Sequence, residues 1–241
     1  MRIDSSRHEH VFRTEWVPGK ILIVGLGSIG SNLACNLAKL NLHELILVDA
    51  DVVEEHNLAN QRFVGADVGE FKVDAVQSAI EAICGAEAGS LPLMLGDSAL
   101  DRLEPPMARC RYETVCLCTD SIESRRLAIE RVKLNRVTDL VVDCRMNATQ
   151  ATVYAFDPRD FGQMARYEAT LHGDDEVDDR NGGCALTQSI GATAQIAADV
   201  AAWQVIHWAR DRAEGRTGDA RVGAFEVIVD MQRFRMLRQP V

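Results

Sequence analysis

The sequence has 241 residues, a length at which one α/β core is common, so we expect a single domain over residues 1–241, with 1–19 as an N-terminal extension. Apolar residues make up 47% of it and charged residues 26%, which excludes a wholly disordered chain and a collagen-like repeat. Its 26 Lys and Arg against 36 Asp and Glu give a net charge of −10, so it lacks the positive field that a nucleic-acid binder needs.

Two further patterns bear on location and on metals. Met1–Lys20 is polar and holds no apolar run of signal-peptide length, and no stretch reaches the roughly 18 apolar residues of a membrane span. We therefore expect a cytoplasmic protein without a membrane partner. The seven cysteines include no C-x-x-C pair, which disfavours a disulfide framework and a four-cysteine site, so no zinc is expected.

The first part of the chain alternates short apolar runs with helical patterns. We expect strands at 20–25, 44–49, 91–95, 113–119 and 139–144, and helices at 29–40, 73–84 and 121–136. Such alternation is typical of a parallel sheet with helices on both faces. A long polar loop follows the second strand, where an ordinary dinucleotide fold would begin its next helix.

The pattern changes after residue 148. Residues 149–156 and 233–237 alternate polar and apolar side chains, which predicts antiparallel strands. Asp157–Gly183 is acidic and predicts a mobile crossover loop. Leu186–Arg210 is Ala-rich with apolar positions on more than one face, which predicts a helix buried in the core or against a second subunit. The predicted fold is α/β and Rossmann-like: a mostly parallel sheet with helices on both faces, extended by antiparallel strands at the C-terminal edge.

A glycine-rich turn joins the first predicted strand to the first helix. In Gly25-Leu26-Gly27-Ser28-Ile29-Gly30 the missing side chains let phosphates approach backbone N–H groups at a helix N-terminus. Asp49, at the end of the second strand, can accept hydrogen bonds from a ribose. Together these features predict an adenine nucleotide but no particular reaction, because dehydrogenases, methyl-transfer enzymes and adenylating enzymes share them.

Charged residues further along the chain narrow the choice. Arg62 and Lys72 are cations that hydride transfer does not require, whereas a departing pyrophosphate needs its charge neutralised. Asp120 follows the fourth predicted parallel strand, at the sheet edge where ligands of open α/β sheets bind, and its carboxylate suits Mg²⁺. Each residue also has a simpler interpretation: Lys72 as a surface lysine, and Asp120 as a cap for the helix beginning at Ser121.

Five segments follow one another in a fixed order along the chain: GLGSIG, Asp49-Ala50-Asp51, NLANQ, DVGEFK and CTD. This ordered set resembles the ubiquitin-activating-like superfamily of adenylyltransferases, whose stand-alone bacterial branch activates sulfur-carrier proteins for thiamin and molybdopterin synthesis. The resemblance runs from about Lys20 to Asp157 and resumes over Cys184–Arg210. It implies that Lys72 contacts phosphates and that Asp120 binds magnesium. It also implies nucleotide contacts from Gly25, Gly27, Ser28, Gly30, Asp49, Asp51, Asn57 and Gln61.

The resemblance implies a reaction as well. ATP and Mg²⁺ would adenylate the C-terminal glycine carboxylate of a ubiquitin-like or sulfur-carrier protein, within a homodimer. Cys184, just before the Ala-rich helix, lies where some relatives place a cysteine that takes a thioester or persulfide; a buried structural cysteine is the other interpretation. The family arginine of N-L-x-R-Q is replaced by Asn60, and we expect Arg62 to take its role.

Two alternatives stay open on the sequence. Asn60 is consistent with a non-catalytic partner subunit, because heterodimeric activating enzymes contain a half that keeps the fold without the chemistry. An NAD(P)- or FAD-dependent oxidoreductase would share the glycine turn and Asp49, but it leaves Lys72 and Asp120 unexplained.

Overall fold

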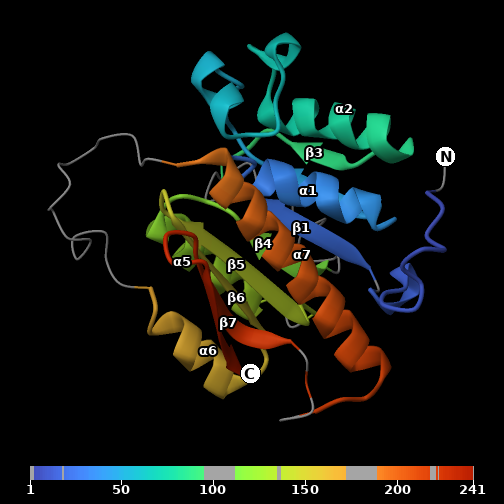
Figure 1. Cartoon of the computed structure of the whole chain (residues 1–241), viewed down its shortest axis with the longest axis vertical. Helices are drawn as coiled ribbons and strands as arrows, with labels where there is room; N and C mark the ends of the chain where they lie inside the picture. Colours follow the sequence, from blue (N-terminus) through green and yellow to red (C-terminus); the bar gives the residue numbers. More distant parts are fainter. Residues whose placement is uncertain are drawn as a thin grey trace, which may run out of the picture.

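Eight strands form one sheet in the order β3-β2-β1-β4-β5-β6-β7-β8 (Figure 1). The computed structural model describes residues 3–17, 19–94, 112–134, 137–171, 189–217, 221 and 223–240. The strands are β1 (Lys20–Val24), β2 (Leu45–Val48), β3 (Gly89–Leu91), β4 (Tyr112–Leu117), β5 (Leu140–Met146), β6 (Gln150–Phe156), β7 (Ala224–Asp230) and β8 (Arg235–Pro240).

The pairing of the strands changes once along the width of the sheet, from parallel to antiparallel. Strands β3, β2, β1, β4 and β5 are parallel, and β6, β7 and β8 continue the sheet as antiparallel neighbours. This confirms the predicted mostly parallel sheet with an antiparallel C-terminal edge. Every residue of β8 is exposed, so this last strand forms an open border of the molecule.

Five helices cover the two faces of the sheet in the described part of the chain. Strand residues alternate between these faces: in β1, Ile21 and Ile23 enter one apolar cluster, and Leu22 and Val24 enter the other. The first cluster includes residues of α1, α2 and α7, and Figure 1 shows α1 and α7 crossing that face. The second includes residues of α5 and α6. The helices are α1 (Gly30–Lys39), α2 (Lys72–Cys84), α5 (Ile122–Leu134), α6 (Phe161–Glu168) and α7 (Gly191–Ala213).

One helix occupies a segment for which the sequence predicted a loop. Within Asp157–Gly183, α6 forms because the Asp160 carboxylate accepts hydrogen bonds from the backbone N–H groups of Gly162 and Gln163. Met164 and Tyr167 are buried on its inner face. The loop prediction was therefore wrong for this part, where a capped and half-buried helix offsets the polar composition. Residues 172–183 lie outside the described residues.

The long helix α7 and strand β3 also differ in their bounds from expectation. The predicted helix Leu186–Arg210 is observed as Gly191–Ala213, and the predicted strand 91–95 as Gly89–Leu91. Small residues such as Ala197, Ala201 and Ala209 pack the helix against the sheet, whereas Trp203 is 49% exposed. Within one described chain, α7 is thus buried mainly on one side. No helix among the described residues is long and apolar enough to cross a membrane.

A fully buried carboxylate joins the sheet to α5 and α6. Asp143, in the middle of β5, accepts hydrogen bonds from Arg125 Nε at 2.8 Å, Arg145 Nε at 2.7 Å and the Tyr167 hydroxyl at 3.0 Å. An ionised carboxylate is costly to bury unless it is paired and hydrogen-bonded. Burial and the charge of Asp143 raise the pKa of Tyr167, so this hydroxyl stays protonated and remains a donor.

Removing one of these donors tests how much the buried group matters. We expect Arg125→Gln to lower the free energy of unfolding by about 3–5 kcal/mol, because Asp143 would lose a buried cationic partner. The matched control is Arg233→Gln, because the ion pair of Arg233 with Asp230 lies on an exposed turn. This control should lower the free energy of unfolding by less than about 1 kcal/mol. Urea titration of both variants measures the difference, and equal stabilities would contradict this account.

Candidate nucleotide-binding site

Two glycines of the turn after β1 are required by close backbone packing. Gly25 has φ +86°, and a Cβ there would lie 2.8 Å from the carbonyl oxygen of Cys118. A Cβ on Gly30 would lie 1.9 Å from the carbonyl oxygen of Gly25. Gly27 differs, because its Cβ would meet nothing within 4 Å among the described atoms. Gly25 and Gly30 allow the backbone of the turn to pack closely. Gly27 leaves open space on the outer side of the turn, where a ligand has room to bind.

Asp49, just after β2, is tied to this turn. Its Oδ2 accepts the Leu26 N–H at 2.6 Å, and its Oδ1 accepts the Asp51 N–H at 2.8 Å. Burial raises the pKa of Asp49, and the two backbone N–H groups partly oppose that rise. The carboxylate therefore fixes the loop beside the glycine turn, in the position where this fold class binds a ribose.

The long polar loop after β2 folds back on itself and delivers Lys72. An antiparallel bridge pairs Val52 with Phe71, and the Lys72 N–H donates to the Asp51 carbonyl at 2.9 Å. The Lys72 side chain is only 8% exposed, and its ammonium lies 2.7 Å from the Asp51 carboxylate, which is 68% exposed. The surface-lysine interpretation is thus wrong: Lys72 begins α2 as a buried cation paired at the site.

The first part of this loop approaches α1. The Arg62 N–H donates to Ser31 Oγ at 3.1 Å, and that hydroxyl donates to the Gly27 carbonyl at 2.7 Å. Arg62 itself is exposed. It also reaches Cys35 of α1, where burial raises the pKa of the thiol and the Arg62 guanidinium opposes that rise. The backbone at Arg62 is therefore anchored to the glycine turn.

Three amide side chains of this loop make different contacts, and two of them, Asn57 and Gln61, are predicted nucleotide contacts. Asn57 is buried in the short helix at Glu55–Ala59, and its Oδ1 accepts the Glu54 N–H at 2.9 Å, so that oxygen serves its own turn. Asn60 donates to the hydroxyl of Ser189, just before α7. Asn60 Oδ1 and Gln61 Oε1 are buried without a hydrogen-bond partner among the described residues. The described chain therefore satisfies neither of these two acceptors.

Asp120 follows β4 and is exposed, with no hydrogen bond or ion pair to the rest of the described chain. The cap of α5 is Ser121, whose Oγ accepts the Ser124 N–H at 3.0 Å, so the interpretation of Asp120 as a helix cap is wrong. Beside it, Thr119 Oγ1 is buried and lacks a partner among the described residues. The Asp120 carboxylate is thus free to meet a ligand.

Arg125 fixes the segment that carries Asp120, a role that the sequence analysis missed. Its guanidinium donates to the carbonyls of Thr119, Ser121 and Cys144 while its Nε pairs with Asp143. An arginine in a predicted charged helix gives no signal of burial, so only the packing identifies it. Ser31 was missed for a similar reason, since a helical serine has many possible roles.

Backbone pairing brings these pieces to one edge of the sheet. The Gly25 N–H donates to the Val48 carbonyl and the Cys118 N–H to the Val24 carbonyl, both at 2.8 Å. The carboxyl ends of β1, β2 and β4 therefore meet at the glycine turn. Cys184 lies outside the described residues. No group of three or more His, Cys, Asp or Glu side chains forms a metal cluster in the described part, so Asp120 would need phosphate and water as further ligands.

The fold and this edge define an α/β nucleotide-binding protein whose site adds a buried lysine and an unpaired carboxylate to the glycine turn. The family model of ThiF matches residues 10–239, so the chain belongs to the ThiF family. This confirms the resemblance to the activating-enzyme superfamily.

Individual relatives match parts of the chain. "Adenylyltransferase and sulfurtransferase MOCS3" of Mus musculus is 37% identical over 110 residues, 44% of this chain and 23% of that protein. "DNA damage tolerance protein RHC31" of Saccharomyces cerevisiae is 35% identical over 63 residues, 26% of this chain and 18% of that protein. The chain thus spans less than a quarter of these curated relatives.

Solved structures match the fold over almost the whole chain. The crystal structure of PaaA has a TM-score of 0.68 at 21% identity, covering 95% of this chain and 66% of that one. The structure of E. coli MccB with ATP has a TM-score of 0.68 at 16% identity, covering 94% and 65%. At these identities the likeness concerns the fold.

The glycine turn offers a matched pair of substitutions. We expect Gly30→Ala to destabilise the protein by about 1–3 kcal/mol or more, because its Cβ collides with backbone at Gly25 that cannot move aside. Gly27→Ala should keep the stability within about 0.5 kcal/mol, because its Cβ enters open space, yet weaken nucleotide binding. Thermal unfolding and ATP titration check both effects, and a Gly27→Ala protein that binds ATP unchanged would place phosphates elsewhere.

Proposed function

We propose that the protein is an adenylyltransferase that uses ATP to activate the C-terminal glycine carboxylate of a ubiquitin-like or sulfur-carrier protein. The observation that carries the proposal is a buried lysine, Lys72, paired with Asp51 at the sheet edge of the glycine turn, where Asp120 has no partner among the described residues. Membership of the ThiF family supports it, as do the adenylyltransferase MOCS3 and the fold shared with MccB, which has been solved with ATP.

The chemistry follows from the charges at this edge. An oxygen of the carrier carboxylate attacks the α-phosphorus of ATP, the bond between the α-phosphorus and the bridging oxygen breaks, and pyrophosphate leaves. N–H groups of Gly27–Gly30 cradle phosphate oxygens, and Lys72 neutralises the charge that develops on them. Arg62, anchored at Ser31, supplies the second cation in place of the arginine absent at Asn60. The product is a carrier acyl-adenylate.

Magnesium fits the residues at this edge. Mg²⁺ is usually held by one or two carboxylates together with substrate phosphates and waters. Asp120 offers one carboxylate without a competing partner among the described side chains, and the Thr119 hydroxyl beside it is unsatisfied. When bound, the ion would neutralise phosphate charge. Asp49, Asp51, Asn57 and Gln61 would surround the nucleoside and phosphates, although one oxygen of Asn57 is engaged by its own turn.

A thioester step is a further part of the proposal. Cys184 lies five residues before Ser189, which is hydrogen-bonded to Asn60 beside the nucleotide site. Five extended residues span at most about 18 Å, which limits how far Cys184 can lie from Ser189. Its sulfur would attack the acyl carbon, AMP would leave, and a thioester would form.

We also propose a homodimer, for which the exposed Trp203 of α7 offers a contact, and a cytoplasmic location.

Pyrophosphate exchange tests the adenylation step. With ATP, Mg²⁺ and a carrier ending in Gly-Gly, the unmodified protein should exchange labelled pyrophosphate into ATP. Asp120→Asn should reduce the rate by about 10²–10³-fold, because one charge-stabilising group at a reacting phosphate typically contributes that much. The control Glu123→Gln removes a neighbouring exposed carboxylate on α5 and should keep full exchange. Absence of exchange with any carrier would favour the non-catalytic partner, and NAD binding would favour the oxidoreductase.

The thioester is tested separately. Carrier and ATP should give an adduct that thiols and hydroxylamine remove, and Cys184→Ser should abolish it while exchange persists, because adenylation needs only the nucleotide site. Non-reducing electrophoresis and intact mass measure the adduct. Persistent exchange without any adduct in the unmodified protein would mean that the adenylate passes directly to an external nucleophile.

A further inference from the structure

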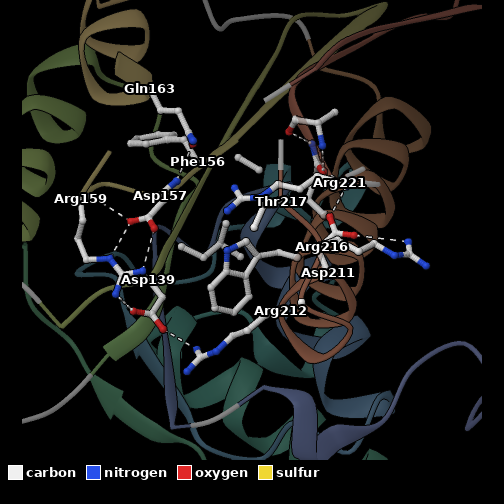
Figure 2. A pocket seen from close by; sticks show the side chains of 17 residues that line it. Asp139, Phe156, Asp157, Arg159, Gln163, Asp211, Arg212, Arg216, Thr217 and Arg221 are labelled. Carbon is white, nitrogen blue, oxygen red and sulfur yellow. Dashed lines mark hydrogen bonds and ion pairs between the residues drawn. The ribbon is translucent and has the colours of Figure 1, made fainter. Parts of the chain in front are cut away.

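A second cavity lies at the edge of the sheet opposite the glycine turn. Its volume is about 330 Å³, within the range of small-molecule sites, and it is formed by the start of β5, the end of β6, the second half of α7 and the start of β7 (Figure 2). Because β5 runs parallel to β1, the amino end at Asp139 faces away from the carboxyl ends that hold Gly25 and Asp120. The cavity is therefore separate from the nucleotide site.

The apolar part of the wall is flat and aromatic. Phe156 at the end of β6 and Trp208 of α7 line the cavity, together with Leu140, Ala155 and Ala224. Trp208 is only partly buried, so it has an accessible surface, and the Arg212 guanidinium lies 5.4 Å from its ring centre. Such a surface favours an apolar or aromatic group of a ligand.

The carboxylates of the cavity are already paired with arginines of its wall. Asp139 binds both Arg159 and Arg212, and Figure 2 shows this chain of ion pairs along one side. Asp157 binds Arg159 at 2.8 Å. Asp211 lies 3.6 Å from the Arg216 guanidinium and accepts the Gly223 N–H at 2.9 Å.

The amides of the wall are also engaged. Gln204 exchanges two hydrogen bonds with the backbone of Ala224. Gln163 accepts the Asp157 N–H and donates to the Asp160 carboxylate. Both amides already make hydrogen bonds within the protein, so the charged side chains of the wall determine which ligand the cavity selects.

One cation in the wall lacks an acidic partner. Arg221 lies on the opposite side from Asp139, near Thr217, and its guanidinium has no ion pair within the described residues (Figure 2). Its backbone is fixed, because Arg238 of β8 donates to the carbonyls of Arg221 and Gly223. Four arginines and three aspartates line the wall, and Glu214 beside it also pairs with Arg216, so Arg221 is the lining arginine without an acidic partner among the described residues.

We propose that this cavity binds a small organic carboxylate carried on a flat apolar group, independently of ATP. The carboxylate pairs with Arg221, whose guanidinium offers two parallel N–H donors, and the apolar group lies against the accessible surface of Trp208. The site thus takes an effector or secondary ligand, and it depends in no way on the adenylation proposed above.

The test compares an acid with its neutral analogue. Calorimetric titration with 2-naphthoate should give one site per chain and bind at least about tenfold tighter than 2-naphthamide, because only the acid forms the charge-assisted pair. Arg221→Gln should weaken naphthoate by about tenfold or more and leave naphthamide unchanged, which also shows that the variant is folded. The control Arg233→Gln, on an exposed turn, should bind both compounds as the unmodified protein does.

The proposal would be overturned by no binding of either compound, by equal affinity for acid and amide, by an unchanged naphthoate affinity in Arg221→Gln, or by displacement with ATP. Saturating ATP with Mg²⁺ should not displace naphthoate. Displacement would mean that the compound occupies the nucleotide site, and Gly27→Ala would then weaken it.

Discussion

The buried carboxylate of Asp143 links the packing of the sheet to the position of the candidate site. It has no solvent exposure, and its charge is tolerable only because two guanidinium groups and a phenol surround it. One of these groups, Arg125, also donates hydrogen bonds from its guanidinium to the carbonyls of Thr119 and Ser121. The charge in the middle of β5 therefore fixes the backbone that carries Asp120, although Asp143 itself is fully buried.

The long loop after β2 fixes the position of a cation, Lys72. A lysine placed by a loop would be mobile, and its charge would be hydrated and ineffective against phosphate. The Val52–Phe71 bridge and the Lys72–Asp51 pair instead place that cation at the first residue of α2, with its stem buried. The carboxylate of Asp51, 2.7 Å away, pairs with this buried ammonium and offsets part of the cost of burying it. The loop shows no regular pattern in the sequence, yet its backbone bridge and its ion pair fix the position of the Lys72 ammonium.

Much of the fold was predictable, because the strands and helices follow hydrophobic periodicity. The positions of GLGSIG, Asp49 and Asp120 after parallel strands also predicted that these segments meet at one edge of the sheet, as the backbone pairing shows. Helix α6 was not predictable, because its stability depends on Tyr167 reaching Asp143, a contact across 24 residues. The roles of Arg125 and Arg221 depend in the same way on tertiary packing, which no local pattern records.

The exposed strand β8 has a consequence for the behaviour of the protein at high concentration. A border strand offers unpaired backbone groups to any other extended chain, and Met236 and Leu237 add exposed apolar surface. Arg235 and Arg238 place positive charge along the same border, and Pro240 removes a donor at its end. Two identical borders would repel each other, so the sheet can stay open-ended in solution without growing into fibrils.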